Sequence, residues 1–150
     1  MELKNLKQHV RTLITLPITE APVISCYQSL INGHLVDRNA CIERVRTLQR
    51  GLSGQTRQDF DAALARIEQF LEGELLPYAQ GLAVFSRMCE EPFFLPLLFR
   101  VPLPNWIVVD GTPNIYHLIE LKDTYHRYVV MIATNESVRI LQVNLGTITA

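Results

Sequence analysis

The first apolar residues of the chain recur every three or four positions, which is the spacing of one face of an α-helix. The residues with this spacing are Leu3, Leu6, Val10, Leu13 and Ile14. Charged and polar residues fill the positions between them. We therefore predict an amphipathic helix over residues 2–15. It is followed by a break at Pro17, because proline has no main-chain N–H to continue the helical ladder.

The same spacing occurs twice more, over residues 39–52 and 56–75. The apolar faces consist of Ile42, Val45, Leu48 and Leu52 in the first segment, and of Phe60, Leu64, Ile67, Leu71 and Leu75 in the second. We expect Asn39 to cap the first helix and Ser53-Gly54 to end it. The pair Thr56 and Asp59 has the spacing of a capping box and is expected to open the second helix.

Four short segments have the composition of β-strands, with runs of β-branched, aromatic or other apolar residues. They are residues 23–27, 81–85, 93–101 and 106–109. Residues 81–85 are apolar without interruption, which predicts burial on both faces of a sheet. The prolines 102 and 104 predict an edge or a corner between the last two strands. Residues 31–38 are expected to form a loop around Gly33.

The last third of the chain begins with a helix from Pro113 to about Tyr125. Two strands follow, over residues 128–134 and 138–145, with a turn between them. Two strands cannot form a stable layer alone, so we expect the first domain or a neighbouring copy to cover this hairpin. The pattern predicts an α/β (α+β) protein. It has a mixed sheet with three to four helices over residues 1–111, then a helix and hairpin over residues 112–150 that begin a second, incomplete domain.

Charge does not direct the chain to a particular partner. Fourteen basic and fifteen acidic side chains give a formal net charge of −1, so no overall field attracts nucleic acid or an anionic membrane. A partner of that kind has to be held by a local patch. No apolar run approaches the length of a membrane helix, and the first residues do not resemble a signal peptide. We therefore expect a cytoplasmic protein with no membrane partner.

The sequence contains no motif typical of catalysis. Its three cysteines and four histidines are scattered without the spacing of a metal site, and no glycine-rich phosphate loop or nucleophile elbow occurs. Glu90-Glu91 stands beside Pro92 and is interpreted as a solvated turn. We expect no enzyme activity, no cofactor, no metal and no small-molecule substrate.

One basic segment is the candidate binding surface. Its arginines are Arg38, Arg44, Arg46, Arg50 and Arg57, against the single acid Glu43. Arg46 and Arg50 lie one helical turn apart and are expected opposite the apolar face of their helix. Arginine binds phosphate groups in a bidentate manner, so this surface is a candidate nucleic-acid site. The alternative is an ordinary solvated helix with a Glu43–Arg46 pair.

Two aromatic features have weaker binding interpretations. Residues 125–128 (YHRY) mix aromatic and basic side chains, as stacking platforms do. The simpler interpretation is a helix C-terminus with favourable positive charges. Trp106 is the only tryptophan, and we expect it to pack in the core or at a sheet edge rather than to stack on a ligand.

Several stretches, taken in order, resemble one family. They are VISCYQSL (23–30), DFDAALARIEQFLE (59–72), GLAVFS (81–86), LPNWIVVDGTPNIYHLIELKDTYHRYVVMI (103–132) and VRILQVNLG (138–146). This order resembles the N-terminal part of the bacterial branch of the peptide-chain release factor and Pelota superfamily. The resemblance implies an N-terminal α/β domain followed by the start of a ribonuclease H-like middle domain. Release factors carry a Gly-Gly-Gln tripeptide in that middle domain. Ser53-Gly54-Gln55 differs from it and is interpreted as a helix stop.

The sequence leaves two functional hypotheses open. The first is a non-catalytic part of a translation-associated factor of the release, rescue or dormancy type, with the ribosome or tRNA as partner. The second is a self-associating module without a nucleic-acid role, which forms a homodimer through the free edge of the hairpin. A nuclease is disfavoured, because the hairpin offers only Glu136 where such enzymes cluster carboxylates around two metals.

Overall fold

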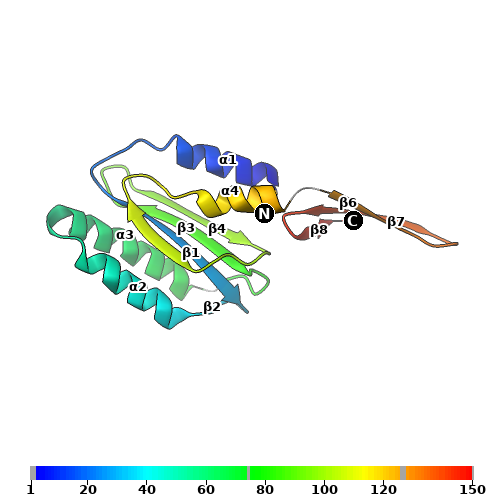
Figure 1. The fold of residues 1–150 in the computed structure, drawn as a ribbon, viewed down its shortest axis with the longest axis horizontal. Helices are drawn as coiled ribbons and strands as arrows, with labels where there is room; N and C mark the ends of the chain where they lie inside the picture. The colour runs from blue at the N-terminus through cyan, green and yellow to red at the C-terminus, as the bar shows by residue number, and fades with distance from the viewer. Residues whose placement is uncertain (1–2, 74, 126–127, 150) are drawn as a thin grey trace.

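A computed structural model describes residues 3–73, 75–125 and 128–149. The part before residue 126 forms a sheet between two layers of helices (Figure 1). The helices are α1 (Leu3–Ile14), α2 (Arg38–Arg50), α3 (Gly54–Glu72) and α4 (Tyr116–Thr124). Helices α1 and α4 cover one face of the sheet, and α2 and α3 cover the other (Figure 1). The four helices expected from the periodicity are therefore present within the described residues.

The sheet of this sandwich has five strands. They are β1 (Val23–Ile31), β2 (His34–Leu35), β3 (Gly81–Arg87), β4 (Phe93–Phe99) and β5 (Trp106–Asp110). Strand β1 pairs with β3 on one side and with both β2 and β5 on the other, and β4 pairs with β3. The α+β class is confirmed. All pairs within the described residues are antiparallel, so the sheet is not the mixed one expected.

The side chains of the central strands alternate between two cores. Tyr27 and Phe85 face α1 and α4, whereas Cys26 and Val84 face α3. Every residue of β3 is buried, as its continuous apolar character predicted. The hydroxyl of Ser86 donates a hydrogen bond of 2.9 Å to the carbonyl of Ala63 on α3, which satisfies a buried polar group at the interface of helix and sheet.

Helix α4 packs on the same core as α1. Leu118 and Leu121 are buried there, and the Tyr27 ring lies 4.9 Å from the ring of His117, between centroids. The main-chain N–H of Asn114 donates to Ser25 Oγ at 2.8 Å, and the Tyr27 hydroxyl donates to the Asn114 carbonyl. Residues 112–125 thus pack with the elements that precede them. A domain boundary at residue 112 stays a prediction.

The C-terminal strands form a separate three-stranded sheet. It contains β6 (Tyr128–Ala133), β7 (Val138–Asn144) and the unpredicted short strand β8 (Thr147–Thr149). Leu145, which is buried, joins the first core, so the base of this sheet is covered. Towards the tip the hairpin projects beyond the sandwich (Figure 1). There Met131 and its partner Ile140 are 68% and 61% exposed, so the first domain does not cover that part of the hairpin. Cover by a neighbouring copy stays a prediction.

Four local expectations were wrong. The first is the loop over residues 31–38, where residues 31–35 form a hairpin, because Asn32 and Gly33 adopt positive φ values of 52° and 79° and join β1 to β2. Asp37 rather than Asn39 caps α2, since its Oδ1 accepts a hydrogen bond of 3.0 Å from the Ala40 N–H.

The capping box expected at Thr56 and Asp59 is also not formed. Helix α3 begins at Gly54, so Thr56 already lies inside it, and the side chain of the N-cap residue Ser53 makes no capping hydrogen bond. Asp59 instead accepts a hydrogen bond of 2.9 Å from Gln55 Nε2, one turn earlier in the helix. Ser53-Gly54 was expected to end α2, which ends earlier, at Arg50, with Gly51 as its C-cap.

Candidate nucleic-acid interface

Helix α2 presents most of its surface to solvent. None of its residues is buried, and its four arginines, Arg38, Arg44, Arg46 and Arg50, are all exposed. The fifth predicted residue, Arg57, lies on α3 and is half-buried. The structure therefore gathers four of the five positive charges on one helix, but it directs them to different neighbours.

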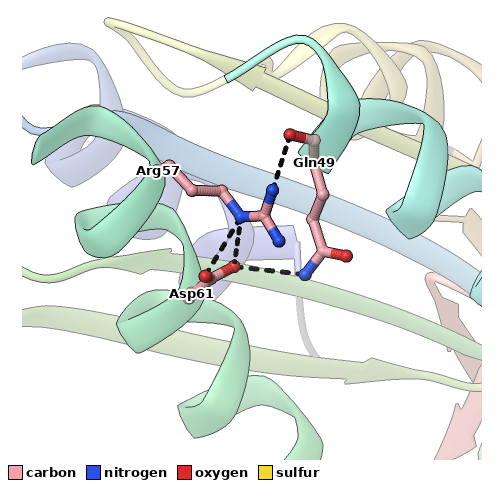
Figure 2. Close-up of polar contacts among 3 residues, drawn as sticks. All are labelled: Gln49, Arg57 and Asp61. Carbon is pink, nitrogen blue, oxygen red and sulfur yellow. Dashed lines mark hydrogen bonds and ion pairs between the residues drawn. The ribbon is translucent and has the colours of Figure 1, made fainter. Parts of the chain in front are cut away.

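Arg57 is occupied by contacts inside the protein (Figure 2). Its Nε donates to both carboxylate oxygens of Asp61 at 3.1 Å, and its Nη1 donates to the Gln49 carbonyl at 3.0 Å. Gln49 closes the network by donating from Nε2 to Asp61 Oδ1 at 3.1 Å. Arg57 thus ties the start of α3 to the end of α2, and the carboxylate compensates its charge.

Arg44 lies against the edge of the sheet. Its Nε donates to the Ile107 carbonyl at 3.1 Å, and its guanidinium lies 5.8 Å from the centroid of the Trp106 ring. Trp106 is 47% exposed at the start of the edge strand β5. The expected position at a sheet edge is therefore observed, and the ring is partly exposed and lies beside a cation, at the distance of a cation–π pair.

Arg38 and Arg46 border a cavity between α2 and α3 that Ile42 and Val45 also line. Arg46 was expected opposite the apolar face of α2, but it lines this cavity together with Ile42, which lies one helical turn away. Its expected exposure to solvent is observed. The alternative Glu43–Arg46 pair is not formed, since the ion pair Arg57–Asp61 is the one present among the described residues. Arg50, at the end of α2, is exposed.

A second, smaller pocket of about 310 Å³ lies between α2 and β5. It is lined by Gln28, Ala40, Cys41, Arg44, Asn105, Trp106 and Ile107. Gln28 is 1% exposed, and its Oε1 has no hydrogen-bond partner among the described residues. A buried acceptor without a partner is costly, so its position at a pocket marks a place where a donor from a ligand or water is favoured.

The pocket combines three kinds of contact. Trp106 supplies an aromatic face, Arg44 a positive charge, and Gln28 an unpaired acceptor. Asn105 is held in place by accepting a hydrogen bond of 2.8 Å at Oδ1 from the Ser29 N–H. A planar ring with N–H groups, attached to an anionic group, has the chemistry that fits these three contacts. Gln28 carries no sequence signal, since only the pairing of β1 with β5 brings it to Trp106. Asn105 directly precedes Trp106, but nothing in the sequence singles it out.

The cysteines near this pocket are poor nucleophiles. Burial raises the pKa of Cys26 to about 12, with a smaller contribution from Cys41 in the same direction. Burial also raises the pKa of Cys41, which nearby Arg38 partly offsets. Thiolates are the reactive form, so raised pKa values oppose reactivity at neutral pH. Within the described ranges, no group of three or more His, Cys, Asp or Glu side chains is arranged to hold a metal ion.

Two further observations concern the remaining predictions. His126 and Arg127 of the YHRY segment lie outside the described residues, so the proposed platform there stays a prediction. Among the helices in the described part of the chain, none combines the length and apolar character needed to cross a membrane.

The fold resembles part of two archaeal proteins of known structure, one of them a translation termination factor. No family model and no curated protein matches the sequence. Among solved structures, the chain is similar to an archaeal protein (TM-score 0.61, 15% identity) and to the archaeal translation termination factor aRF1 (TM-score 0.63, 14% identity). Each likeness covers 99% of this chain and 43% of the other. The resemblance to release factors is thus confirmed for the fold, and the bacterial branch stays a prediction.

Proposed function

We propose that this chain is part of a translation-associated factor that contacts RNA of the ribosome or tRNA through the face formed by α2 and β5. The observation that carries the proposal is the pocket where Arg44, Trp106 and the unpaired Gln28 Oε1 meet. The likeness in fold to an archaeal termination factor supports the choice of RNA over other planar anionic ligands. The proposal includes no catalytic step.

Electrostatics set the expected strength of binding. The net charge of −1 gives no long-range attraction, so phosphates have to be attracted by a local patch, which here is the exposed arginines of α2. If these four side chains neutralise about four phosphates of a single strand, log Kd should rise with log salt with a slope of about 3. Stacking of a base on Trp106 adds about 1–3 kcal/mol that does not depend on salt.

The test is fluorescence anisotropy with a labelled single-stranded RNA, combined with co-sedimentation with ribosomes at low salt. Arg46→Glu/Arg50→Glu should lower affinity and flatten the salt slope, because each reversal removes a phosphate contact. Trp106→Ala should lower affinity without changing that slope. Arg11→Glu is the matched control, since Arg11 is exposed on α1 in the opposite helical layer. Equal losses with Arg11→Glu, or no binding at low salt, would contradict the proposal.

A second candidate is self-association through the C-terminal hairpin. Register places Val129, Met131, Val138 and Ile140 on one face, and these four side chains are 60–68% exposed. Apolar surface of this kind favours a partner. Sedimentation velocity over a range of concentrations tests it. The double substitution Met131→Glu/Ile140→Glu should shift any dimer to monomer, and a monomer at all concentrations would remove this candidate.

A further inference from the structure

A well-formed opening lies between α2 and α3. It is a cavity of about 430 Å³, within the range of small-molecule sites. Residues of β1 and β5, including Ile24, Cys26 and Ile107, form its floor. Its walls are the facing sides of the two helices. This cavity adjoins the pocket beside Trp106, since Cys41 and Ile107 line both. Ile42 and the residues of α3 line this cavity and not that pocket.

The walls are two helical stripes that face each other without closing. Residues 38, 41, 42, 45, 46 and 49 of α2 and residues 64, 67, 68, 71 and 72 of α3 line the cavity, and both sets have the spacing of one helix face. Apolar stripes of this kind normally bury each other. Here none of the α2 residues is buried, and Ile42 remains 41% exposed. An apolar occupant would cover both stripes.

The charged side chains of the cavity are divided between its walls. Arg38 and Arg46 come from α2, and Glu68 and Glu72 come from α3. All four are exposed, which places their charged ends towards the solvent side of the cavity. None of them has a side-chain hydrogen bond or ion pair among the described residues. Two positive groups therefore face two negative groups across the cavity without neutralising each other by direct contact.

We propose that this cavity binds a small zwitterion with an apolar body, which is the chemistry of a large apolar amino acid. The anionic group pairs with Arg38 and Arg46, and the cationic group pairs with Glu68 and Glu72. The apolar body lies between Val45 on α2 and Ile67 on α3. A ligand with a single charge leaves one pair of side chains unsatisfied and adds an unbalanced charge, so it binds less well. The inference does not depend on RNA binding.

Four probes with the same number of carbons separate the contributions of the anionic group, the cationic group and the apolar body to the affinity. They are 2-aminooctanoate, octanoate, octylamine and octanol, titrated calorimetrically into the full chain below their micellar range. We expect 2-aminooctanoate to bind at least several-fold more tightly than the other three. Arg38→Gln/Arg46→Gln should remove its advantage over octylamine, and Glu68→Gln/Glu72→Gln should remove its advantage over octanoate. Arg50→Gln is the matched control and should leave all four affinities unchanged.

The cysteines report where the probe binds. Cys41 is half-buried in the cavity wall, whereas Cys89 lies outside it. Bound 2-aminooctanoate should slow alkylation of Cys41 by iodoacetamide several-fold and leave Cys89 unaffected. Ile42→Trp should fill the cavity from a partly exposed position and abolish binding, with an unchanged circular dichroism spectrum as the check on folding.

Three results would overturn the inference. The first is equal affinity for all four probes, which would indicate a nonspecific apolar site. The second is binding that leaves the alkylation rate of Cys41 unchanged. The third is loss of binding in Met131→Glu, which would place the probe on the exposed hairpin instead.

Discussion

Arg44 on α2 donates from Nε to the main-chain carbonyl of Ile107 on β5 over 3.1 Å. This bond links the helix that carries most of the candidate RNA-binding residues to the edge of the sheet. It matters because α2 has no buried residue to hold it in place. Hydrogen bonds from the middle of α2 to Ile107 and from Arg57 to the end of α2 therefore supplement the half-buried apolar contacts of this helix.

Arg44→Lys should loosen α2 locally. Lysine keeps the charge but cannot reproduce both the Nε hydrogen bond and the planar contact with Trp106. We expect a loss of about 1 kcal/mol in the free energy of local opening. Faster amide hydrogen exchange in α2, with unchanged exchange in β3, is the measurement. Arg50→Lys is the control and should change neither. A uniform increase in exchange across the sheet would contradict a local role.

Arg57→Ala should destabilise the pair of helices. The substitution removes the contact with Asp61 and the hydrogen bond to the Gln49 carbonyl. Both charged side chains are partly exposed, at 40% and 45%, so the expected loss in unfolding free energy is about 1 kcal/mol. Chemical denaturation measures it. Arg11→Ala should stay within about 0.5 kcal/mol of the parent chain.

Gln28→Leu separates stability from binding. Leucine removes an unpaired buried acceptor and keeps a similar apolar volume, so stability should stay equal or rise by about 1 kcal/mol. RNA affinity should fall, because the acceptor offered to a base is lost. Chemical denaturation and anisotropy on the same preparation measure the two effects. A variant that is less stable and binds RNA normally would show that Gln28 contributes to folding stability and not to RNA binding.

Gly81→Ala should destabilise the sandwich strongly. A Cβ at this position would lie 2.5 Å from the Val101 carbonyl oxygen and 3.0 Å from Leu103 Cγ. Relief of that overlap requires a main-chain shift next to a fully buried strand, which costs about 1–3 kcal/mol. Thermal unfolding measures it. Gly111→Ala is the matched control, because a Cβ there meets nothing within 4 Å, and its unfolding temperature should hardly change.

Cys26 should make the protein less stable in alkali. Its folded pKa of about 12 exceeds the ordinary thiol value of 9.0, so between these values the unfolded chain ionises while the folded chain keeps its proton. Stability is unaffected below pH 9 and falls above it, by up to about 1.4 kcal/mol per pH unit for this group. Burial raises the pKa of Tyr27 as well, so part of the slope belongs to that side chain.

The measurement for Cys26 is unfolding free energy from pH 8 upward in the parent chain and in Cys26→Ala. The variant should start less stable, because a buried side chain is shortened, and should show a shallower decline with pH. Tyr27→Phe should flatten the remaining slope at higher pH. Parallel curves for the parent chain and Cys26→Ala would contradict the buried, protonated thiol.

Periodicity predicted the sandwich well because amphipathic helices and buried strands are repeated patterns. The apolar steps of residues 39–52 and the unbroken run at residues 81–85 became α2 and the buried strand β3. Ends of elements were predicted less well. Asp37 and Asn39 are both good helix caps, and the choice between them depends on main-chain angles that composition does not encode.

The arginines of α2 show most clearly which features the sequence determines and which the tertiary structure determines. The sequence by itself determined that a basic helix exists and that its apolar positions share one face. Only the tertiary structure decided that Arg57 is bound by Asp61, that Arg46 borders a cavity, and that Arg44 meets Ile107, 63 residues away. The reason is physical. A helical pattern depends on neighbours one turn apart, whereas the partner of a side chain depends on strand pairing and packing between distant segments.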